Sequence, residues 1–309
     1  MRLQTTLRHI ATLSGIGLHS GSTVSMRLLP GAADSGIVFR RMDVEPLRSM
    51  IAARYDAVCD TRLGTTICNA HGVSVSTIEH LMAALWGAGL DNVLIELDAP
   101  EVPIMDGSSA PFVELLEHAG VTRLAAPKRI LRVLKAVEVR DGESFARIAP
   151  NREGDEGMAL SIAVEYDNAV IGRQSAFYDF RESTFAEELS RARTFGFAHE
   201  VEALQKAGLA LGGSLENAIV VGEESVLNAE GLRFDDEFVR HKALDCVGDL
   251  FLAGLRIDGA LTFVRPGHGI NNKLVRALMA DESAYEIVAS EALPVAAASV
   301  ARYNNLLSL

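Results

Sequence analysis

The stretch RHKALDCVGDL, residues 240–250, holds an imidazole and two carboxylates at regular spacing. His241, Asp245 and Asp249 follow one another at intervals of four residues, which places their side chains along one face of a helix. The rest of this predicted helix is largely apolar. Catalytic zinc typically has three protein ligands from His, Asp or Glu and one water. The pattern therefore allows a metal site to which this helix contributes His241 and Asp245.

A second stretch, STIEHLMAALWGAGL at 76–90, offers a third ligand in His80, and Glu79 precedes it. A carboxylate next to a ligand can take the proton of the attacking water without binding the metal, as the glutamate of HExxH enzymes does. Simpler interpretations exist for both fragments. A His–Asp pair one turn apart is more often a surface ion pair, and an acidic residue in a first helical turn favours the helix dipole.

A further histidine, His268, lies in the glycine-flanked stretch RPGHGINN. Glycines on both sides allow close approach to a ligand, and loops on a rigid scaffold often carry catalytic residues. Asp249 could orient His268, raise its pKa and make it a general acid. The alternative is a loop histidine with only structural hydrogen bonds.

These residues need a framework of helices and strands, which the apolar periodicity and the Gly and Pro positions outline. Residues 121–129 are the expected linker between two halves. Strands are predicted at 23–30, 36–43, 91–98, 130–139, 144–150, 159–167, 217–224 and 259–264, and helices at 76–90, 106–120, 184–192, 199–213, 236–254 and 271–288.

The two histidine-bearing helices show a weak internal similarity. Each has a His near the start, an apolar body and a Gly-Leu stop, and each is followed by a strand. The helices differ in length by about one turn. If the similarity reflects a duplication, two similar α+β halves face each other and His80 lies opposite His241.

The composition excludes several classes of protein. The net charge of −12, without a basic stripe, argues against a nucleic-acid partner. The polar N-terminal stretch does not resemble a signal peptide, and no window approaches the ~18 apolar residues of a membrane helix. The three cysteines show no CxxC spacing, which argues against a disulfide framework and favours a reducing cytoplasm.

Taken together and in order, six motifs resemble the zinc-dependent UDP-3-O-acyl-N-acetylglucosamine deacetylases of lipid A biosynthesis in Gram-negative bacteria. The resemblance runs along nearly the whole chain, and the motifs are long and specific. They are LSGIGLHSG (13–21), STIEHLMAAL (76–85), PIMDGSSAPFV (103–113), SRARTFGF (190–197), LRFDDEFVRHKALDCVGDL (232–250) and GHGINNKL (267–274).

The resemblance implies an α+β fold of two similar domains, each with helices layered on a β-sheet and each with a small insertion. The active site would lie between them. It implies domains at 1–125 and 126–309, with a β-α-β insertion at about 197–224 that forms a passage for the substrate acyl chain. Apolar side chains in that range could line such a passage or simply pack the insertion; they are Val201, Leu204, Leu209 and Leu211.

The resemblance also implies a zinc-dependent hydrolysis of the N-acetyl group, which gives acetate and the free amine. By motif match, His80, His241 and Asp245 are the expected zinc ligands. Glu79 resembles the general base and His268 the general acid.

The remaining roles follow in the same way. Asp249 is the expected partner that orients the acid, and Lys242 resembles a lysine that contacts substrate. Thr194 resembles the threonine that helps polarise the amide oxygen, with Phe195 beside it. The uridine-binding segment departs from the family pattern, and Tyr166 is the expected aromatic contact of the uracil there.

Two other functions stay open at this stage. Another zinc amidohydrolase would have the same ligands but no acyl passage, and a metal-free sugar-nucleotide binding protein would use these helices only for packing. For the deacetylase we expect a small-molecule substrate, a cytoplasmic location, no integral membrane segment and a monomer. Two His and one Asp suit Zn²⁺ and also Fe²⁺, and the sequence does not fix the acyl chain length.

Overall fold

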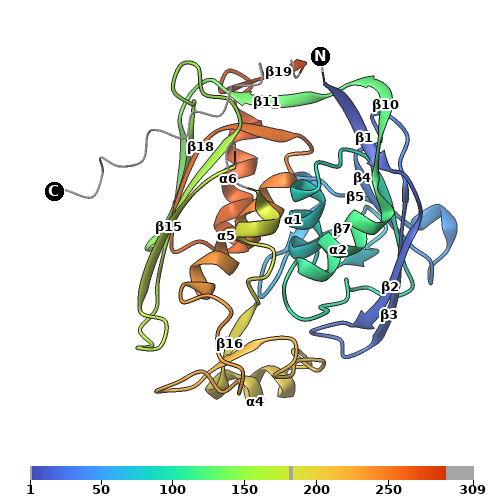
Figure 1. The fold of residues 1–309 in the computed structure, drawn as a ribbon. Helices are drawn as coiled ribbons and strands as arrows, with labels where there is room; N and C mark the ends of the chain where they lie inside the picture. The colour runs from blue at the N-terminus through green and yellow to red at the C-terminus, as the bar shows by residue number, and fades with distance from the viewer. Residues whose placement is uncertain (1, 181–183, 290–309) are drawn as a thin grey trace.

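A computed structural model describes residues 2–180 and 184–289. Two β-sheets form the outer layers of the molecule, and the main helices lie between them (Figure 1). The first half supplies one sheet with helices α1 (Glu79–Gly87) and α2 (Ala110–Ala119). The second half supplies the other sheet with helices α5 (Glu237–Phe251) and α6 (His268–Ala280). This arrangement confirms the predicted α+β class with helices layered on sheets.

The sheet of the first half has five strands in the order β2-β3-β9-β4-β5. Strands β4 and β9 are parallel, and the other pairs are antiparallel. Residues along β3 alternate between exposed and buried, as expected for a sheet with one face on the core. The strands are β2 (Ala11–Ile16), β3 (Thr23–Pro30), β4 (Ile37–Arg41), β5 (Met50–Ala52) and β9 (Val93–Leu97).

A smaller sheet of three antiparallel strands belongs to the same half. Its strands are β6 (Val58–Asp60), β7 (Thr66–Cys68) and β8 (Ser74–Val75), and two 3-10 turns precede it, η1 (Pro46–Arg48) and η2 (Tyr55–Ala57).

The sheet of the second half follows the order β12-β13-β18-β11-β19, and β14 joins it beside β18 with β15 at its outer side. Strand β18 runs parallel to β11 and β14. The strands are β11 (Arg129–Val133), β12 (Val137–Asp141), β13 (Ser144–Ala149), β14 (Met158–Glu165), β15 (Arg173–Asp179), β18 (Arg256–Val264) and β19 (Tyr285–Ala289).

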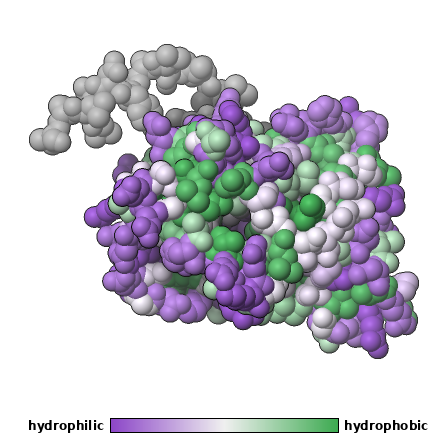
Figure 2. Space-filling model, turned by 90° about the horizontal axis from the view of Figure 1, so that it is seen from below, coloured by the Kyte–Doolittle hydropathy of each residue, from purple (hydrophilic) through white to green (hydrophobic). Residues whose placement is uncertain are grey.

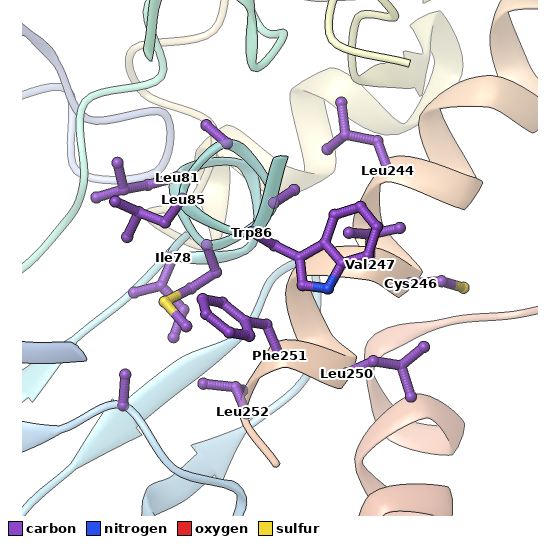
Figure 3. Packing of buried hydrophobic residues seen from close by; sticks show 14 of the residues in the cluster. Ile78, Leu81, Leu85, Trp86, Leu244, Cys246, Val247, Leu250, Phe251 and Leu252 are labelled. Atoms are coloured by element: carbon purple, nitrogen blue, oxygen red, sulfur yellow. The ribbon is translucent and has the colours of Figure 1, made fainter. Parts of the chain in front are cut away.

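Helices α1 and α5 pack against each other at the centre of the molecule, and their apolar side chains form part of one core shared by both halves (Figure 3). Their close approach depends on Gly248, because a Cβ there would lie 2.1 Å from the backbone oxygen of Glu79. Figure 3 shows Trp86 of α1 beside Val247 of α5 at this contact, while Leu81 and Leu85 lie on the other side of α1.

A β-α-β unit projects from one end of the second half (Figure 1). Strands β16 (Phe195–Phe197) and β17 (Ile219–Val221) pair in parallel, and α4 (Ala198–Lys206) connects them. We call this unit, residues 195–221, the insertion. The short helix α3 (Phe185–Glu188) precedes it. None of the residues of α4 is buried, so this helix contributes partly exposed apolar side chains rather than a core of its own.

Three predictions of local structure were wrong. The single strand expected at 130–139 is two strands, because β11 ends at Val133 and β12 begins at Val137. Most of the expected linker at 121–129 is strand β10 (Val121–Pro127), which pairs antiparallel with β1 (Leu3–Leu7). The helix expected at 271–288 begins at His268 and ends at Ala280, and β19 occupies the last part of the range. Asp281 leaves the helical conformation with φ −107° and ψ 88°, which turns the chain back toward β11.

Candidate metal centre and active site

His80, His241 and Asp245 converge where α1 meets α5. Nε2 of His80 lies 3.5 Å from Oδ1 of Asp245, and Nε2 of His241 lies 3.4 Å from the same oxygen. The two imidazole rings meet edge to face with centroids 4.9 Å apart. The three ligand atoms lie within 4.8 Å of one another, and all three residues are buried. The fold therefore places His80 opposite His241, as the similarity between the two helices predicted.

The chemistry of this group suits a metal ion. Oδ1 of Asp245 is buried and has no hydrogen-bond partner among the described residues, although it faces both histidines. An unpaired buried carboxylate oxygen is costly unless a cation compensates it. Nδ1 of His241 lies 3.0 Å from the carbonyl oxygen of Ala192, so Nδ1 donates and Nε2 stays free to bind.

Burial also lowers the pKa of His241 to about 3, which keeps its imidazole in the neutral form that coordinates metals. The three side chains could thus hold a metal ion between the two halves.

Glu79 lies beside this group at the start of α1. Its Oε2 accepts a hydrogen bond from the backbone N–H of Thr65 at 2.9 Å. Its Oε1 lies 3.9 Å from Nε2 of His268, across the site. The segment at Gly64 and Thr65 can approach this carboxylate because residue 64 has no side chain. A Cβ there would lie 2.9 Å from Oε1. Burial raises the pKa of Glu79, which makes it a better proton acceptor than an exposed glutamate.

His268 begins α6 and faces the same space. Its Nδ1 lies 2.9 Å from Oδ2 of Asp249, which also accepts a hydrogen bond from the side-chain amide of Asn271 at 2.8 Å. The hydroxyl of Thr65 donates to the other oxygen of Asp249 at 2.5 Å. Burial alone would lower the pKa of His268, but the charges of Asp249 and Glu79 outweigh it and raise the pKa to about 9. At neutral pH His268 therefore carries a proton that it can donate.

The loop before the insertion brings Thr194 and Phe195 to the site. The main chain of Thr194 is fixed between the halves, because its N–H donates to Gly107 and its carbonyl accepts from Ile219, both at 2.8 Å. The ring of Phe195 meets the ring of His241 nearly perpendicularly, with centroids 6.2 Å apart. This loop therefore forms one wall beside the three candidate metal ligands.

Lys242 and Tyr166 lie around Phe195. Nζ of Lys242 is 5.3 Å from the centre of the Phe195 ring and 3.0 Å from Oδ2 of Asp245. The ring of Tyr166 packs edge to face on Phe195 at 5.7 Å and tilts against Phe197 at 5.9 Å. Tyr166 is thus near the expected catalytic residues, while its contact with a uracil stays a prediction.

The sequence did not reveal two residues that hold the expected acid–base pair. Thr65 contacts both Glu79 and Asp249, and Asn271 shares an oxygen of Asp249 with His268. Asn271 lies within the GHGINN motif, which is the one signal that could have indicated it. Thr65 is distant from Asp249 in the chain, and only the fold brings them together.

A cavity of about 280 Å³ lies between the first half and the insertion. The face that carries the insertion has hydrophobic residues around a hollow (Figure 2). Of the residues expected to line an acyl passage, Leu209 lines this cavity, while Val201 and Leu204 are half-buried and Leu211 is exposed. Other residues of the cavity wall include His19, Leu63, Gly64, Thr66 and Thr77.

Within the described residues, none of the helices has both the length and the apolar character needed to span a bilayer.

Known proteins resemble this chain along nearly its whole length. The family model described as UDP-3-O-acyl N-acetylglycosamine deacetylase matches residues 4–280. A protein of Myxococcus xanthus named UDP-3-O-acyl-N-acetylglucosamine deacetylase is 52% identical over 286 residues, which are 92% of this chain and 89% of the relative. Proteins of the same name are 46% identical in Pseudoalteromonas atlantica, over 96% of this chain and 97% of the relative. In Vibrio cholerae the identity is 47% over 92% of each chain.

Proposed function

This chain belongs to the family of UDP-3-O-acyl N-acetylglycosamine deacetylases, and on that premise we propose the reaction and the roles of its residues. It hydrolyses the N-acetyl group of UDP-3-O-acyl-N-acetylglucosamine to acetate and the free amine, an early step of lipid A biosynthesis. The observation that carries this proposal is the convergence of His80, His241 and Asp245 beside a buried carboxylate and a protonated histidine.

Zinc is the proposed metal, and His80, His241 and Asp245 are the side chains that would hold it. Two histidines and one aspartate suit Zn²⁺, and the same set also binds Fe²⁺. When bound, zinc would act as a Lewis acid that activates water and polarises the acetyl carbonyl.

The proton transfers fall to Glu79 and His268. Glu79 accepts the proton of the water that attacks the acetyl carbon, and its raised pKa suits that role. His268 donates a proton to the sugar nitrogen as the C–N bond breaks, which prevents the departure of an unstable amide anion. Asp249 keeps His268 charged and fixes its orientation through Nδ1.

Other side chains position the substrate. Thr194 stabilises charge on the acetyl oxygen with its hydroxyl, and Phe195 and Lys242 contact the sugar nucleotide from the same wall. Tyr166 stacks on the uracil, a role supported by its place in the aromatic group with Phe195. The acyl chain enters the cavity at Leu209 and continues along the insertion.

The two halves are proposed to be domains, 1–125 and 126–309, of which residues 290–309 lie outside the described part of the chain. The protein is proposed to act in the cytoplasm, which agrees with three free cysteines. It is proposed to act as a monomer, because one chain supplies all the catalytic side chains named above.

The test is acetate release from UDP-3-O-acyl-N-acetylglucosamine before and after chelation, followed by titration with zinc. We expect activity to disappear on chelation and to return with zinc. Activity that is indifferent to chelation would exclude the metal, and activity on N-acetyl sugars that lack the UDP or the acyl chain would favour another amidohydrolase. His241→Ala serves as a control, because it should stay inactive when zinc is added.

A further inference from the structure

Glu101 is a buried carboxylate outside the set assigned above, with only 1% of its surface exposed. Its Oε1 accepts hydrogen bonds from the backbone N–H of His19 at 2.8 Å and from the hydroxyl of Thr77 at 3.1 Å. Its Oε2 accepts from the backbone N–H of Ser20 at 2.9 Å. The three donors are neutral, so hydrogen bonds compensate the buried charge. Removing any of them would leave the carboxylate poorly solvated.

Thr77 has a strained backbone immediately before the catalytic helix. Its φ is +57°, in the left-handed region that a β-branched residue rarely adopts. Ile78 follows as the N-cap of α1, and Glu79 and His80 are the first two residues of that helix. The conformation of Thr77 therefore determines the direction in which α1 begins. The hydroxyl of Thr77 donates the hydrogen bond that Glu101 accepts, so this hydrogen bond helps to fix the positions of Glu79 and His80.

The same carboxylate also fixes the turn that touches the insertion. His19 and Ser20 lie in this turn, whose carbonyl groups accept hydrogen bonds from the insertion: Leu211 N–H donates to His19 at 3.2 Å, and Gly212 N–H donates to Leu18 at 3.0 Å. A Cβ at residue 212 would lie 2.3 Å from the backbone oxygen of Gly17, so the two segments are in close contact. One side chain therefore reaches both the start of α1 and the wall of the proposed acyl passage.

We propose that Glu101 is a positioning residue that holds the start of α1 for metal binding and couples it to the insertion. This inference rests on the proposed function, since it gives Glu79 and His80 the roles of base and ligand. It predicts two separable effects. Loss of the Thr77 contact reduces metal affinity and kcat, and loss of the contacts with His19 and Ser20 raises KM for substrates with a long acyl chain.

The first experiment compares Glu101→Gln with Glu96→Gln in the full-length protein. Glutamine replaces one acceptor oxygen by an NH₂ group, which would face an N–H or O–H donor. We expect the zinc affinity of Glu101→Gln, measured by competition with a chelator, to fall about tenfold or more. We also expect kcat to fall. Glu96 is a matched control because it is equally buried but pairs with Arg27 and Arg40, away from α1. Glu96→Gln should keep the wild-type zinc affinity.

Substitutions of Thr77 test the same contact without changing the carboxylate. Thr77→Val keeps the branched shape but removes the hydroxyl, so we expect weaker zinc binding. Thr77→Ser keeps the hydroxyl and should bind zinc like the wild type. Thr77→Gly adopts the positive φ without strain, so Glu101→Gln should reduce zinc affinity less in that background than in the wild type.

Folded Glu101→Gln with wild-type zinc affinity and kcat would overturn the proposal. If that variant does not fold, Thr77→Val with unchanged zinc affinity overturns it equally. If Glu101→Gln has an unchanged KM for long-chain substrates, Glu101 does not act on the insertion, and that part of the proposal is wrong. Failure of the proposed function would be a different result. If the wild-type protein had no deacetylase activity, comparing its zinc affinity with that of Glu101→Gln would still show whether Glu101 controls metal binding.

Discussion

At the scale of single residues, the proposed acid–base pair is the part of the site on which the rate should depend most. Glu79 and His268 face each other at 3.9 Å, and buried partners hold each of them from the side away from that gap. Burial raises the pKa of Glu79, which makes it a stronger base, and His268, with a pKa of about 9, stays protonated at neutral pH. Substitutions here should change catalysis more than folding.

Glu79→Gln should lower kcat about 10²–10⁴-fold, because general acid–base catalysis typically contributes that factor. Zinc content should not fall, since the proposed ligands are His80, His241 and Asp245. The measurements are acetate release and metal analysis of the same preparation. Loss of zinc together with activity would mean that Glu79 acts on the metal site rather than on the proton.

Asp249→Asn should shift the alkaline limb of the pH–rate profile to lower pH. His268 must be protonated to act as the acid, so with a pKa of about 9 activity should persist up to roughly that pH and fall above it. Without the charge of Asp249, burial dominates and the pKa of His268 falls. The measurement is kcat/KM against pH for both proteins, with thermal unfolding as the control for structure. An unchanged alkaline limb would show that another group sets it.

At the scale of elements, the contact between α1 and α5 brings the proposed metal ligands together, and Gly248 permits this contact. Gly248→Ala should separate the helices, because its Cβ would lie 2.1 Å from the backbone oxygen of Glu79. Overpacking of this kind costs about 1–3 kcal/mol, and the gain in helix propensity offsets at most about 1 kcal/mol. We expect a lower Tm and weaker zinc binding. Gly196→Ala is the control, since a Cβ there meets no atom within 4 Å.

The same elements show how much of the fold was predictable. The ranges expected for α1, α2 and α5 overlap the observed helices, because apolar runs and glycine stops mark such elements. The edge strands β1 and β10 were not recognised, since their burial is irregular and their pairing spans the whole first half. The apolar periodicity after Ala280 also favoured a helix, but these residues form β19, which is stabilised by its pairing with β11.

The candidate site was predicted better than the fold around it. Helical spacing indicated His241 and Asp245. The start of the helix at 76–90 indicated Glu79 and His80, and the glycine-flanked stretch indicated His268. The structure brings these five side chains together. Thr65 was missed because its hydroxyl and N–H contribute only through a loop whose path depends on tertiary contacts. Spacing along one element reveals ligands of that element but not contacts between distant segments.

At the scale of the whole molecule, the cavity beside the insertion should set the acyl chain that the enzyme accepts. Leu209→Trp adds volume to the wall of a cavity of about 280 Å³. We expect KM to rise for long-chain substrates and to change little for short-chain ones. The measurement is kcat/KM for substrates that differ only in acyl length. Equal effects on all lengths would place the acyl chain elsewhere.

The ligands of the proposed metal come from helices that lie far apart in the sequence, His80 in α1 and His241 with Asp245 in α5. A metal ion there would act as a reversible cross-link that closes about half of the chain into a loop. A cross-link that closes a long loop removes more conformational entropy from the unfolded chain than one that closes a short loop. The metal would therefore stabilise the folded state by raising the free energy of the unfolded state. Amide hydrogen exchange should therefore slow in both sheets when zinc binds, including strands that contact no ligand.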